Sequence, residues 1–353
     1  MTSVLDPGGV DLELDLDASG DPARALVALP LDEWADRPTG WIGAAADAVR
    51  RALPLTVGVL RGPAPPDDRL APLLTAATLS LTAAEVPHIA RELVQLPDLD
   101  EGLALLHAAV IRSPRAALAC GRLLRQTERL GADEGLAAEA AVYSMLMSGP
   151  EFARWLAERG ELPAPPVSAE PLVLLERVGG RLSIALNNPA RRNAFSFAMR
   201  EELLGALHVA ELDPSVTEVR IHGCGPSFCS GGDLAEFGSA TDPTAAYLVR
   251  LARAPWRIVD ALADHVTIRV HGACIGAGLE LAAFAGRVTA SPDAFFALPE
   301  VGMGLVPGAG GTVSVPRRVG RWRAGWLSLT GQRLDAATAL GWGLVDEVER
   351  PAG

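Results

Sequence analysis

Two glutamates stand in apolar, glycine-rich stretches of this sequence. Glu280 lies in HGACIGAGLELAAF, and Glu300 lies in AFFALPEVGMGLVPGAGGT. An ionised carboxylate is costly to bury unless it is paired or put to use. Burial would raise both pKa values toward neutrality, and the pair would then suit general acid/base catalysis. The alternative, that each glutamate is a helix-end or loop charge facing water, stays open on the residues alone.

Two glycine-rich turns each stand between a predicted strand and a predicted helix. The first is GCGPSFCSGGDLAEF, residues 223–237, and the second is HGACIGAGLEL. Glycine permits a tight turn and lets a ligand approach backbone amides, and the first amides of a helix have no internal partner. Two such turns predict a pair of amides that converge on one oxygen, as in an oxyanion hole. Neither turn matches GxGxxG or GxxxxGK[ST], which argues against a nucleotide phosphate site.

Several blocks of the chain, taken in order, resemble the signature blocks of the crotonase superfamily, the enoyl-CoA hydratases and isomerases. They are SFCSGGDLAEF, GACIGAGLELAAFAGRV, FFALPEVGMGLVPGAGGT and LTGQRLDAATALGWGLVDEV. The earlier stretch LNNPARRNAFSFAM is similar to the block whose backbone meets the adenine of coenzyme A. The resemblance covers roughly residues 171–348. It implies an α/β fold with a crotonase-like ββα spiral core and an acyl-CoA thioester as substrate.

The resemblance also implies roles for four residues. The backbone N–H groups of Gly232 and Ala277 would be the two oxyanion donors, and Glu280 and Glu300 fall on the two glutamates of the hydratases. Retention of both glutamates favours hydration of a 2-enoyl thioester. In that mechanism Glu280 takes a proton from the water that attacks C3, and Glu300 delivers a proton to C2.

Coenzyme A is expected to lie along ARRNAF and GGDLAEF. The implied contacts with the thioester are Arg191, Arg192, Ala194, Gly232, Asp233, Leu234 and Ala277. An arginine fork meets phosphate oxygens well, although arginines beside a loop are often only solvated. No cofactor is expected, because coenzyme A enters as part of the substrate, and no metal-ligand spacing is visible.

The elements that position these residues change character along the chain. Residues 1–165 are predicted to form a mostly α-helical domain, since apolar residues recur at helical spacing over 69–96, 101–130 and 131–160. PLTVGVL, residues 54–60, is compatible with a short strand. Strands, glycine-rich loops and helices alternate after the Pro-rich residues 161–171 and predict an α/β layered catalytic domain over 171–353.

The likeness is weaker at both ends of the chain. The family continues for several helices beyond GLVDEV, so this catalytic domain is expected to lack the usual C-terminal helices. EGLALLHAAVIRSPRAALACGRLL resembles part of the N-terminal helical domain of the cofactor-free 3,5-dihydroxyphenylacetyl-CoA 1,2-dioxygenases, which lack both glutamates. An isomerase, a decarboxylase, a dioxygenase-like enzyme of secondary metabolism and a non-catalytic thioester-binding partner therefore stay open as alternatives.

Composition limits the class of partner. The formal net charge of −12 argues against a nucleic-acid partner, and every basic residue is arginine, so no lysine is available for Schiff-base chemistry. No apolar run reaches the roughly 18 residues of a membrane span. Four cysteines without a CxxC pair, and no signal peptide, indicate reduced thiols in a cytoplasmic protein. The resemblance implies a homo-oligomer, either a trimer or a dimer of trimers.

Overall fold

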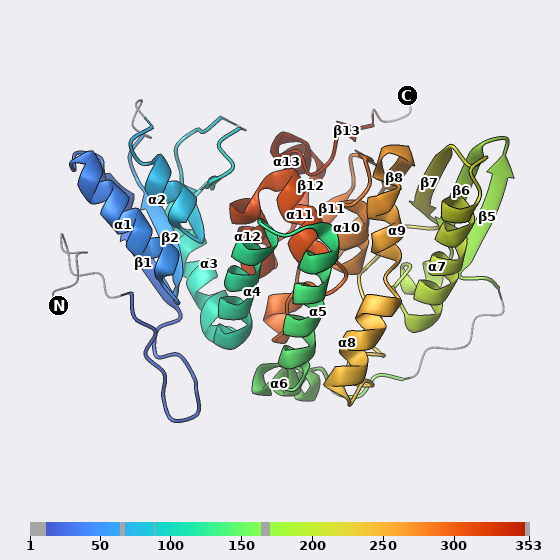
Figure 1. The fold of residues 1–353 in the computed structure, drawn as a ribbon, viewed down its shortest axis with the longest axis horizontal. Coiled ribbons are helices and arrows are strands. Elements are labelled where there is room, and N and C mark those ends of the chain that lie inside the picture. Colours follow the sequence, from blue (N-terminus) through green and yellow to red (C-terminus); the bar gives the residue numbers. More distant parts are fainter. Residues whose placement is uncertain (1–11, 64–67, 88, 164–169, 350–353) are drawn as a thin grey trace.

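The computed structural model describes residues 12–63, 68–87, 89–163 and 170–349. Its N-terminal region begins with a parallel sheet in the order β1-β2-β3-β4, shown in blue and cyan in Figure 1. The elements of this sheet region are β1 (Leu26–Pro30), η1 (Leu31–Trp34), α1 (Thr39–Arg51), β2 (Leu55–Leu60), α2 (Ala71–Ala76), β3 (Leu79–Thr82) and β4 (Leu93–Gln95).

This sheet corrects one sequence prediction and confirms another. PLTVGVL does contain a strand, β2, but residues 69–96 hold α2, β3 and β4 rather than continuous helix. Every residue of β2 and β3 is buried. A strand covered on both faces shows no polar alternation, so its short apolar run cannot be told from a helical one by spacing alone.

Four consecutive helices follow, and they confirm the prediction for residues 101–160. They are α3 (Leu99–Arg112), α4 (Pro114–Thr127), α5 (Ala132–Met147) and α6 (Pro150–Arg159). The Asp98 carboxylate caps α3 by accepting a hydrogen bond from the Glu101 amide at 2.9 Å. Pro150 is the first residue of α6, where a missing N–H costs nothing, so Gly149-Pro150 separates two helices as predicted.

The C-terminal half contains a six-stranded sheet and a three-stranded sheet, in an α/β arrangement as predicted. The six-stranded sheet has the order β13-β10-β8-β7-β6-β5, and only β5 and β6 pair antiparallel, as the hairpin around Gly179-Gly180. Its strands are β5 (Val173–Val178), β6 (Arg181–Leu186), β7 (Glu218–Gly223), β8 (Val266–Val270), β10 (Arg287–Ala290) and β13 (Glu347–Val348). The three-stranded sheet joins β9 (Ala273–Ile275), β11 (Phe295–Ala297) and β12 (Leu334–Asp335).

Helices connect these strands and cover the sheets. They are η2 (Pro189–Arg191), α7 (Phe197–Leu212), α8 (Pro243–Ala252), α9 (Pro255–Ala261), η3 (Ala263–His265), α10 (Ala277–Ala282), η4 (Glu300–Met303), α11 (Gly311–Val319), α12 (Arg321–Thr330) and α13 (Ala336–Trp342). Figure 1 shows α3–α6 in front of α11 and α12, between the N-terminal sheet and the six-stranded sheet. Part of the predicted linker, residues 164–169, lies outside the described residues.

One hydrophobic core runs from β2 and β3 through α3–α6 into the C-terminal half. Within it, α4 packs on both α11 and α12, and α3 packs on α12. Gly102 of α3 and Gly325 of α12 lie at these contacts: a Cβ on Gly102 would be in van der Waals contact with Trp326 at 3.6 Å, and one on Gly325 with Leu124 at 3.7 Å. Helices α3–α6 therefore pack as part of the same core that surrounds the C-terminal sheets, whereas α1 and α2 pack in a separate cluster with β1.

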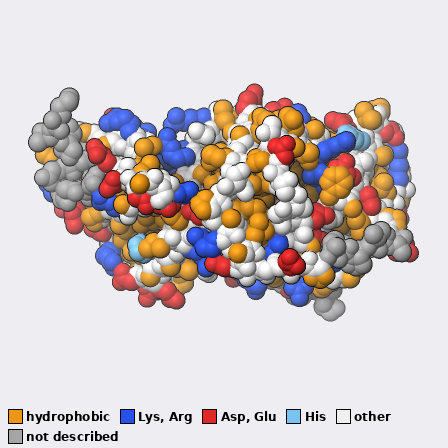
Figure 2. Space-filling view, turned by 90° about the horizontal axis from the view of Figure 1, so that it is seen from below, with side chains coloured by type: hydrophobic (Ala, Val, Ile, Leu, Met, Phe, Trp, Pro, Cys, Tyr) orange, Lys and Arg blue, Asp and Glu red, His pale blue; other side chains and the backbone are white. Residues whose placement is uncertain are grey.

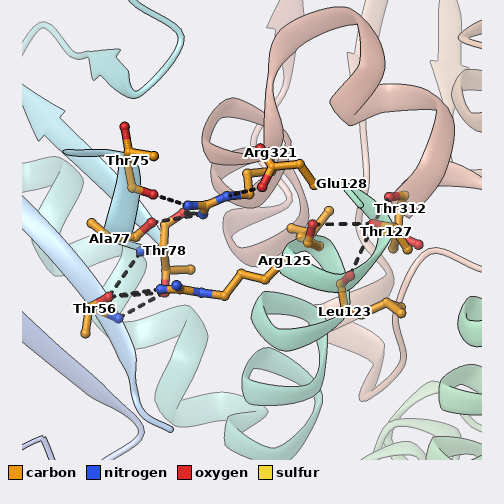
Figure 3. Close-up of polar contacts among 11 residues, drawn as sticks. Thr56, Thr75, Ala77, Thr78, Leu123, Arg125, Thr127, Glu128, Thr312 and Arg321 are labelled. Atoms are coloured by element: carbon orange, nitrogen blue, oxygen red, sulfur yellow. Dashed lines mark hydrogen bonds and ion pairs between the residues drawn. The ribbon is translucent and has the colours of Figure 1, made fainter. Parts of the chain in front are cut away.

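A buried arginine joins α12 to the N-terminal sheet, as Figure 3 shows. Arg321, only 5% exposed, donates hydrogen bonds to the carbonyl oxygens of Thr75, Ala77 and Thr78 and to the Glu128 carboxylate. Such a cation is tolerated in the interior because its N–H groups find acceptors.

No single helix among the described residues is long and apolar enough to cross a membrane. Only α3 and α4 taken together have the length and composition of a membrane span, and the two helices are bent by 108° at Ser113.

Figure 2 shows apolar side chains gathered in the middle of the face seen from below, with acidic and basic side chains around them.

The Arg321 contacts make a stability prediction. Arg321→Gln should lower the free energy of unfolding by about 2–3 kcal/mol, because buried carbonyls lose a charged donor. Arg317→Gln, which breaks the exposed ion pair with Asp260, should cost at most about 1 kcal/mol. Urea unfolding of both variants measures the difference, and equal losses would contradict the assigned importance of Arg321.

Candidate functional site

The two glycine-rich turns predicted from the sequence lie side by side. The Cys229 amide donates to the Ala273 carbonyl, and the Ile275 amide donates to the Cys229 carbonyl, each at 3.0 Å. Beyond this pairing both segments turn at glycines with positive φ, Gly231 at +94° and Gly276 at +49°. Only a residue without a side chain adopts these conformations readily, so the glycines of the two turns are required by the backbone.

Two backbone amides emerge from these turns without an acceptor among the described residues. Gly232 is bridged to Phe195, but the bridge uses the amides of Phe195 and Asp233 and leaves that of Gly232 unbonded. Ala277 is the first residue of α10, and its amide has no partner within the helix. Two unbonded amides at the ends of adjacent segments are the elements of a site for a negatively charged oxygen.

Glu280 is buried and hydrogen-bonded to backbone amides. It lies in α10, three residues after Ala277, and is 2% exposed. Its Oε2 atom accepts from the Ala309 amide at 2.7 Å and from the Gly311 amide at 2.8 Å. Burial raises the pKa of Glu280, and these amide hydrogen bonds oppose that rise because they favour the ionised form.

Glu300 is buried without comparable hydrogen bonds. It begins η4 and is 8% exposed, and its Oε2 atom has no hydrogen-bond partner among the described residues. A Cβ on Gly276 would lie 2.4 Å from Oε1 of Glu300, so this carboxyl group rests against the turn that presents the Ala277 amide. Burial, followed by the negative charge of Glu280, raises the pKa of Glu300 well above its ordinary value.

The predicted coenzyme A contacts fall into two groups. Arg191 forms an ion pair with the buried Asp233, with Nε 3.0 Å from Oδ2, so its guanidinium is already engaged. Arg192 is exposed and adopts a left-handed backbone at φ +53°. Ala194 is buried and Leu234 is exposed. Arg192 is thus the exposed cation of this predicted set.

An aromatic group from α6 reaches the first turn. The ring of Phe237 lies over Gly232, where an added Cβ would approach Cε2 to 2.8 Å. Trp155 of α6 packs edge-on against Phe237, with ring centroids 5.7 Å apart. Arg159 at the end of α6 donates to the carbonyl oxygens of Leu234 and Phe237. Helix α6 therefore holds the segment beside one of the two unbonded amides.

Three residues that the sequence prediction did not include, Glu139, Tyr143 and Arg250, interact with Glu280. Glu139 and Tyr143 of α5 face the loop that precedes α11: Glu139 accepts hydrogen bonds there, and a Cβ on Gly308 would lie 2.3 Å from the Tyr143 ring. Arg250 of α8 stacks on that ring and donates to the Gly308 carbonyl at 2.7 Å. The sequence feature that could have pointed to Glu139 was a glutamate on the apolar face of a predicted helix.

Other features of the described residues lie apart from this chemistry. Hollows of about 460 Å³ beside α5, α7 and α9 and about 1100 Å³ beside α3, α12 and α13 include neither Glu280 nor Glu300 in their linings. Burial raises the pKa of the Cys229 thiol to about 12, so this cysteine is protonated at neutral pH. No three His, Cys, Asp or Glu side chains in the described part of the chain are grouped to hold a metal ion.

Comparison with known proteins decides the family. A family model described as enoyl-CoA hydratase/isomerase matches residues 176–351. The probable enoyl-CoA hydratase of Rhizobium meliloti (strain 1021) is 34% identical over 179 residues, which are 50% of this chain and 69% of that protein. The chain belongs to the enoyl-CoA hydratase/isomerase family. The predicted resemblance to the crotonase superfamily is thereby confirmed.

Further relatives of the hydratase/isomerase family show the same partial coverage. The 2,3-dehydroadipyl-CoA hydratase of Escherichia coli (strain K12) is 36% identical over 167 residues, 47% of this chain and 65% of that protein. An enoyl-CoA hydratase structure from Thermoplasma volcanium GSS1 is 34% identical, with a TM-score of 0.48, and covers 51% of this chain and 72% of that one. The chain thus spans about 65% of the length of the first curated relatives it matches.

The raised pKa of Glu300 predicts how stability depends on pH. A carboxyl whose pKa is higher in the folded state binds more protons there, so the free energy of unfolding falls as pH rises from the unfolded value, about 4.3, toward the folded value. Glu300→Gln removes this group and should flatten the fall between pH 5 and pH 8. Each unit of raised pKa is worth about 1.4 kcal/mol.

Urea unfolding at several pH values measures this effect. Glu33→Gln, at an exposed position, is the matched control and should keep the wild-type slope. Parallel curves for wild type and Glu300→Gln would contradict the raised pKa.

Proposed function

We propose that this protein is an enoyl-CoA hydratase-type lyase, which adds or removes water across the 2,3 double bond of an acyl-CoA thioester. The observation that carries the proposal is the meeting of two unbonded amides, Gly232 and Ala277, with two buried glutamates, Glu280 and Glu300. Membership of the hydratase/isomerase family supports an acyl-CoA substrate.

The first step is polarisation of the thioester. The amides of Gly232 and Ala277 donate to the carbonyl oxygen and withdraw electron density from the double bond, which leaves C3 electrophilic. Each such donor is typically worth about 3–4 kcal/mol in the transition state. The enolate that forms keeps its negative oxygen on these two amides.

The hydrogen bonds of the two glutamates support different roles for them. Glu280 accepts two amide N–H groups at one oxygen, which favours its ionised form and the role of base. Glu300 has a buried oxygen without a partner, which favours its protonated form and the role of acid. Water then loses a proton to Glu280 as its oxygen bonds to C3, and Glu300 gives its proton to C2. Dehydration runs through the same steps in reverse.

The coenzyme A part and the acyl group of the thioester would bind to residues around the two unbonded amides. We place the coenzyme A phosphates near Arg192, because Arg191 is engaged with Asp233. The acyl group would meet Phe237 and, behind it, Trp155 of α6. A homo-oligomer, cytoplasmic location and a role in secondary metabolism stay predictions.

Activity with defined thioesters tests the proposal. Crotonyl-CoA and aromatic enoyl-CoAs should lose their enoyl absorbance, with ¹⁸O from labelled water entering the product. Glu280→Gln and Glu300→Gln should each lower kcat by about 10²–10⁴-fold, the usual worth of a proton-transfer group. Glu33→Gln is the exposed control and should keep wild-type activity.

Other results of the same assay identify the alternatives. Movement of the double bond without ¹⁸O uptake would indicate an isomerase, and oxygen consumption with an arylacetyl-CoA would indicate a dioxygenase. Equal thioester binding by wild type and Glu280→Gln, with no turnover in either, would indicate a non-catalytic binding protein. Each of these outcomes would overturn the hydratase assignment.

The unequal glutamates also predict the pH profile of hydration. The kcat should rise as pH climbs through the pKa of Glu280, which must be ionised, and fall above the pKa of Glu300, which must be protonated. In Glu300→Gln the high-pH fall should disappear from the residual activity. Rates measured between pH 5 and pH 10 check this, and an unchanged high-pH limb would assign the acid to another group.

A further inference from the structure

A third buried carboxylate holds the loop that precedes α11. Glu139 of α5, 2% exposed, accepts from the Gly310 amide at its Oε1 atom (2.6 Å) and from the Thr312 amide at its Oε2 atom (2.8 Å). The Thr312 hydroxyl donates to the same Oε2 at 2.7 Å. On its other side, the Thr312 carbonyl accepts from the Thr127 hydroxyl of α4 at 2.6 Å, as Figure 3 shows.

The same loop holds the proposed base. Glu280 binds the amides of Ala309 and Gly311, and Glu139 binds those of Gly310 and Thr312. The two carboxylates therefore alternate along four consecutive amides at the positive end of α11. Because successive residues of one short loop are bonded to the two groups, moving one carboxylate displaces the amides that fix the other.

The hydrogen bonds favour the ionised form of Glu139. Both of its oxygens accept hydrogen bonds, from three donors in all. Burial and the charge of Glu280 raise the pKa of Glu139 to about 8, while the bonds from Thr312 and Gly310 oppose that rise, so its full charge is present above that pH. After burial and the charge of Glu280, Glu139 also raises the pKa of Glu300.

Packing leaves this contact little freedom. Leu136, Glu139, Ala140 and Tyr143 share one buried face of α5 at helical spacing. A Cβ on Gly310 would lie 2.4 Å from Phe284 and 3.1 Å from Leu136. Helix α5 and the loop are packed so closely that the loop cannot move to restore the contacts that a shorter or uncharged side chain at position 139 would lose.

We propose that Glu139 is a positioning residue of the acid/base site: α5 places its carboxylate so that it fixes the amides holding Glu280 and sets the charge beside Glu300. This inference rests on the proposed function and deepens it. Residue 139 lies outside the range 176–351 that the family model matches, so the N-terminal helices supply part of the site.

The charges that face Glu139 define what a variant changes. Glu280 of α10 and Glu300 of η4 are the acids that interact with Glu139, and Arg250 of α8 is the cation that interacts with Glu280. Cys120 of α4 also lies within the field of Glu139, but burial raises the pKa of its thiol to about 12, so it is neutral. Loss of the charge at 139 should therefore be felt mainly by the two glutamates.

Three variants separate charge from geometry. Glu139→Gln should lower kcat for crotonyl-CoA by about 10–100-fold with little change in KM. The fall of kcat at high pH should shift to lower pH by about one pH unit, because removal of a like charge lowers the pKa of Glu300. Glu139→Asp keeps the charge, but its shorter side chain places the carboxylate farther from the amides. The kcat should therefore be lower, while the fall of kcat at high pH should stay near its wild-type pH.

The matched control is Glu151→Gln. Glu151 of α6 is 4% exposed and also binds two backbone amides, those of Arg115 and Ala116 at 2.8 and 2.9 Å. Both Gln variants lose a buried, amide-binding carboxylate of the helical region. Only Glu139→Gln should change the pH profile, whereas a merely structural role for position 139 would make the two variants alike.

A titration that needs no turnover keeps this inference separate from the hydratase assignment. Infrared spectra of protein labelled with ¹³C-carboxyl glutamate, recorded across pH, give the titration midpoint of Glu300, whose band is identified by its loss in Glu300→Gln. The midpoint should move to lower pH in Glu139→Gln but not in Glu139→Asp or Glu151→Gln.

Each result has a defined meaning. An unmoved Glu300 midpoint in folded Glu139→Gln overturns the charge role. If Glu139→Gln does not fold, Glu139→Asp decides, and wild-type kcat in that variant overturns the positioning role. Absence of enoyl-CoA turnover in wild type, with the midpoint shifted as expected, would reject the hydratase assignment and leave the coupling of Glu139 to Glu300 in place.

Discussion

Burial of carboxylates against backbone amides is the constraint on which this structure depends. Glu139 and Glu280 are removed from water, and four consecutive amides at the start of α11 take the place of that water. A buried carboxylate without such donors would be forced to take up a proton. The glycines at 308, 310 and 311 matter for this reason, because added side chains there would strike Tyr143, Phe284 or Glu280.

The N-terminal helices are tied to the C-terminal half by several independent contacts. Thr127 of α4 donates to the Thr312 carbonyl, Arg159 of α6 donates to the Phe237 carbonyl, and Arg321 of α12 donates to the Ala77 carbonyl between α2 and β3. These bonds join elements far apart in the sequence, and they add to the hydrophobic core that α3–α6 share with the C-terminal half. A change in the packing of α4–α6 would therefore reach the segment beside the Gly232 amide and the loop that holds Glu280.

Sequence reasoning predicted what local patterns encode. The two glycine turns predicted a pair of converging amides, and the turns do lie side by side. The residues alone left open whether Glu280 and Glu300 are buried or face water, and the structure buries both. The choice of Gly232 and Ala277 came from the resemblance. Their catalytic roles still rest on the resemblance. What local patterns could not encode was the partner of each group: the Arg191–Asp233 pair and the contact of Glu139 with Thr312 join positions 42 and 173 residues apart. The strand β3 was missed because burial on both faces removes the alternation that marks a strand, and β4 was missed because its three residues are too few to show a pattern.

The difference between the two proposed catalytic glutamates shows why such long-range partners matter for chemistry. Both side chains are carboxylic acids in the same apolar surroundings, so composition gives them the same expected behaviour. The amides at 309 and 311 stabilise the ionised form of Glu280, whereas the Oε2 atom of Glu300 has no described donor. Two identical groups whose surroundings push their pKa values apart can serve as base and acid in one reaction. In this protein that separation depends on a loop that Glu139 holds from α5, ahead of the region that carries the family's signature blocks.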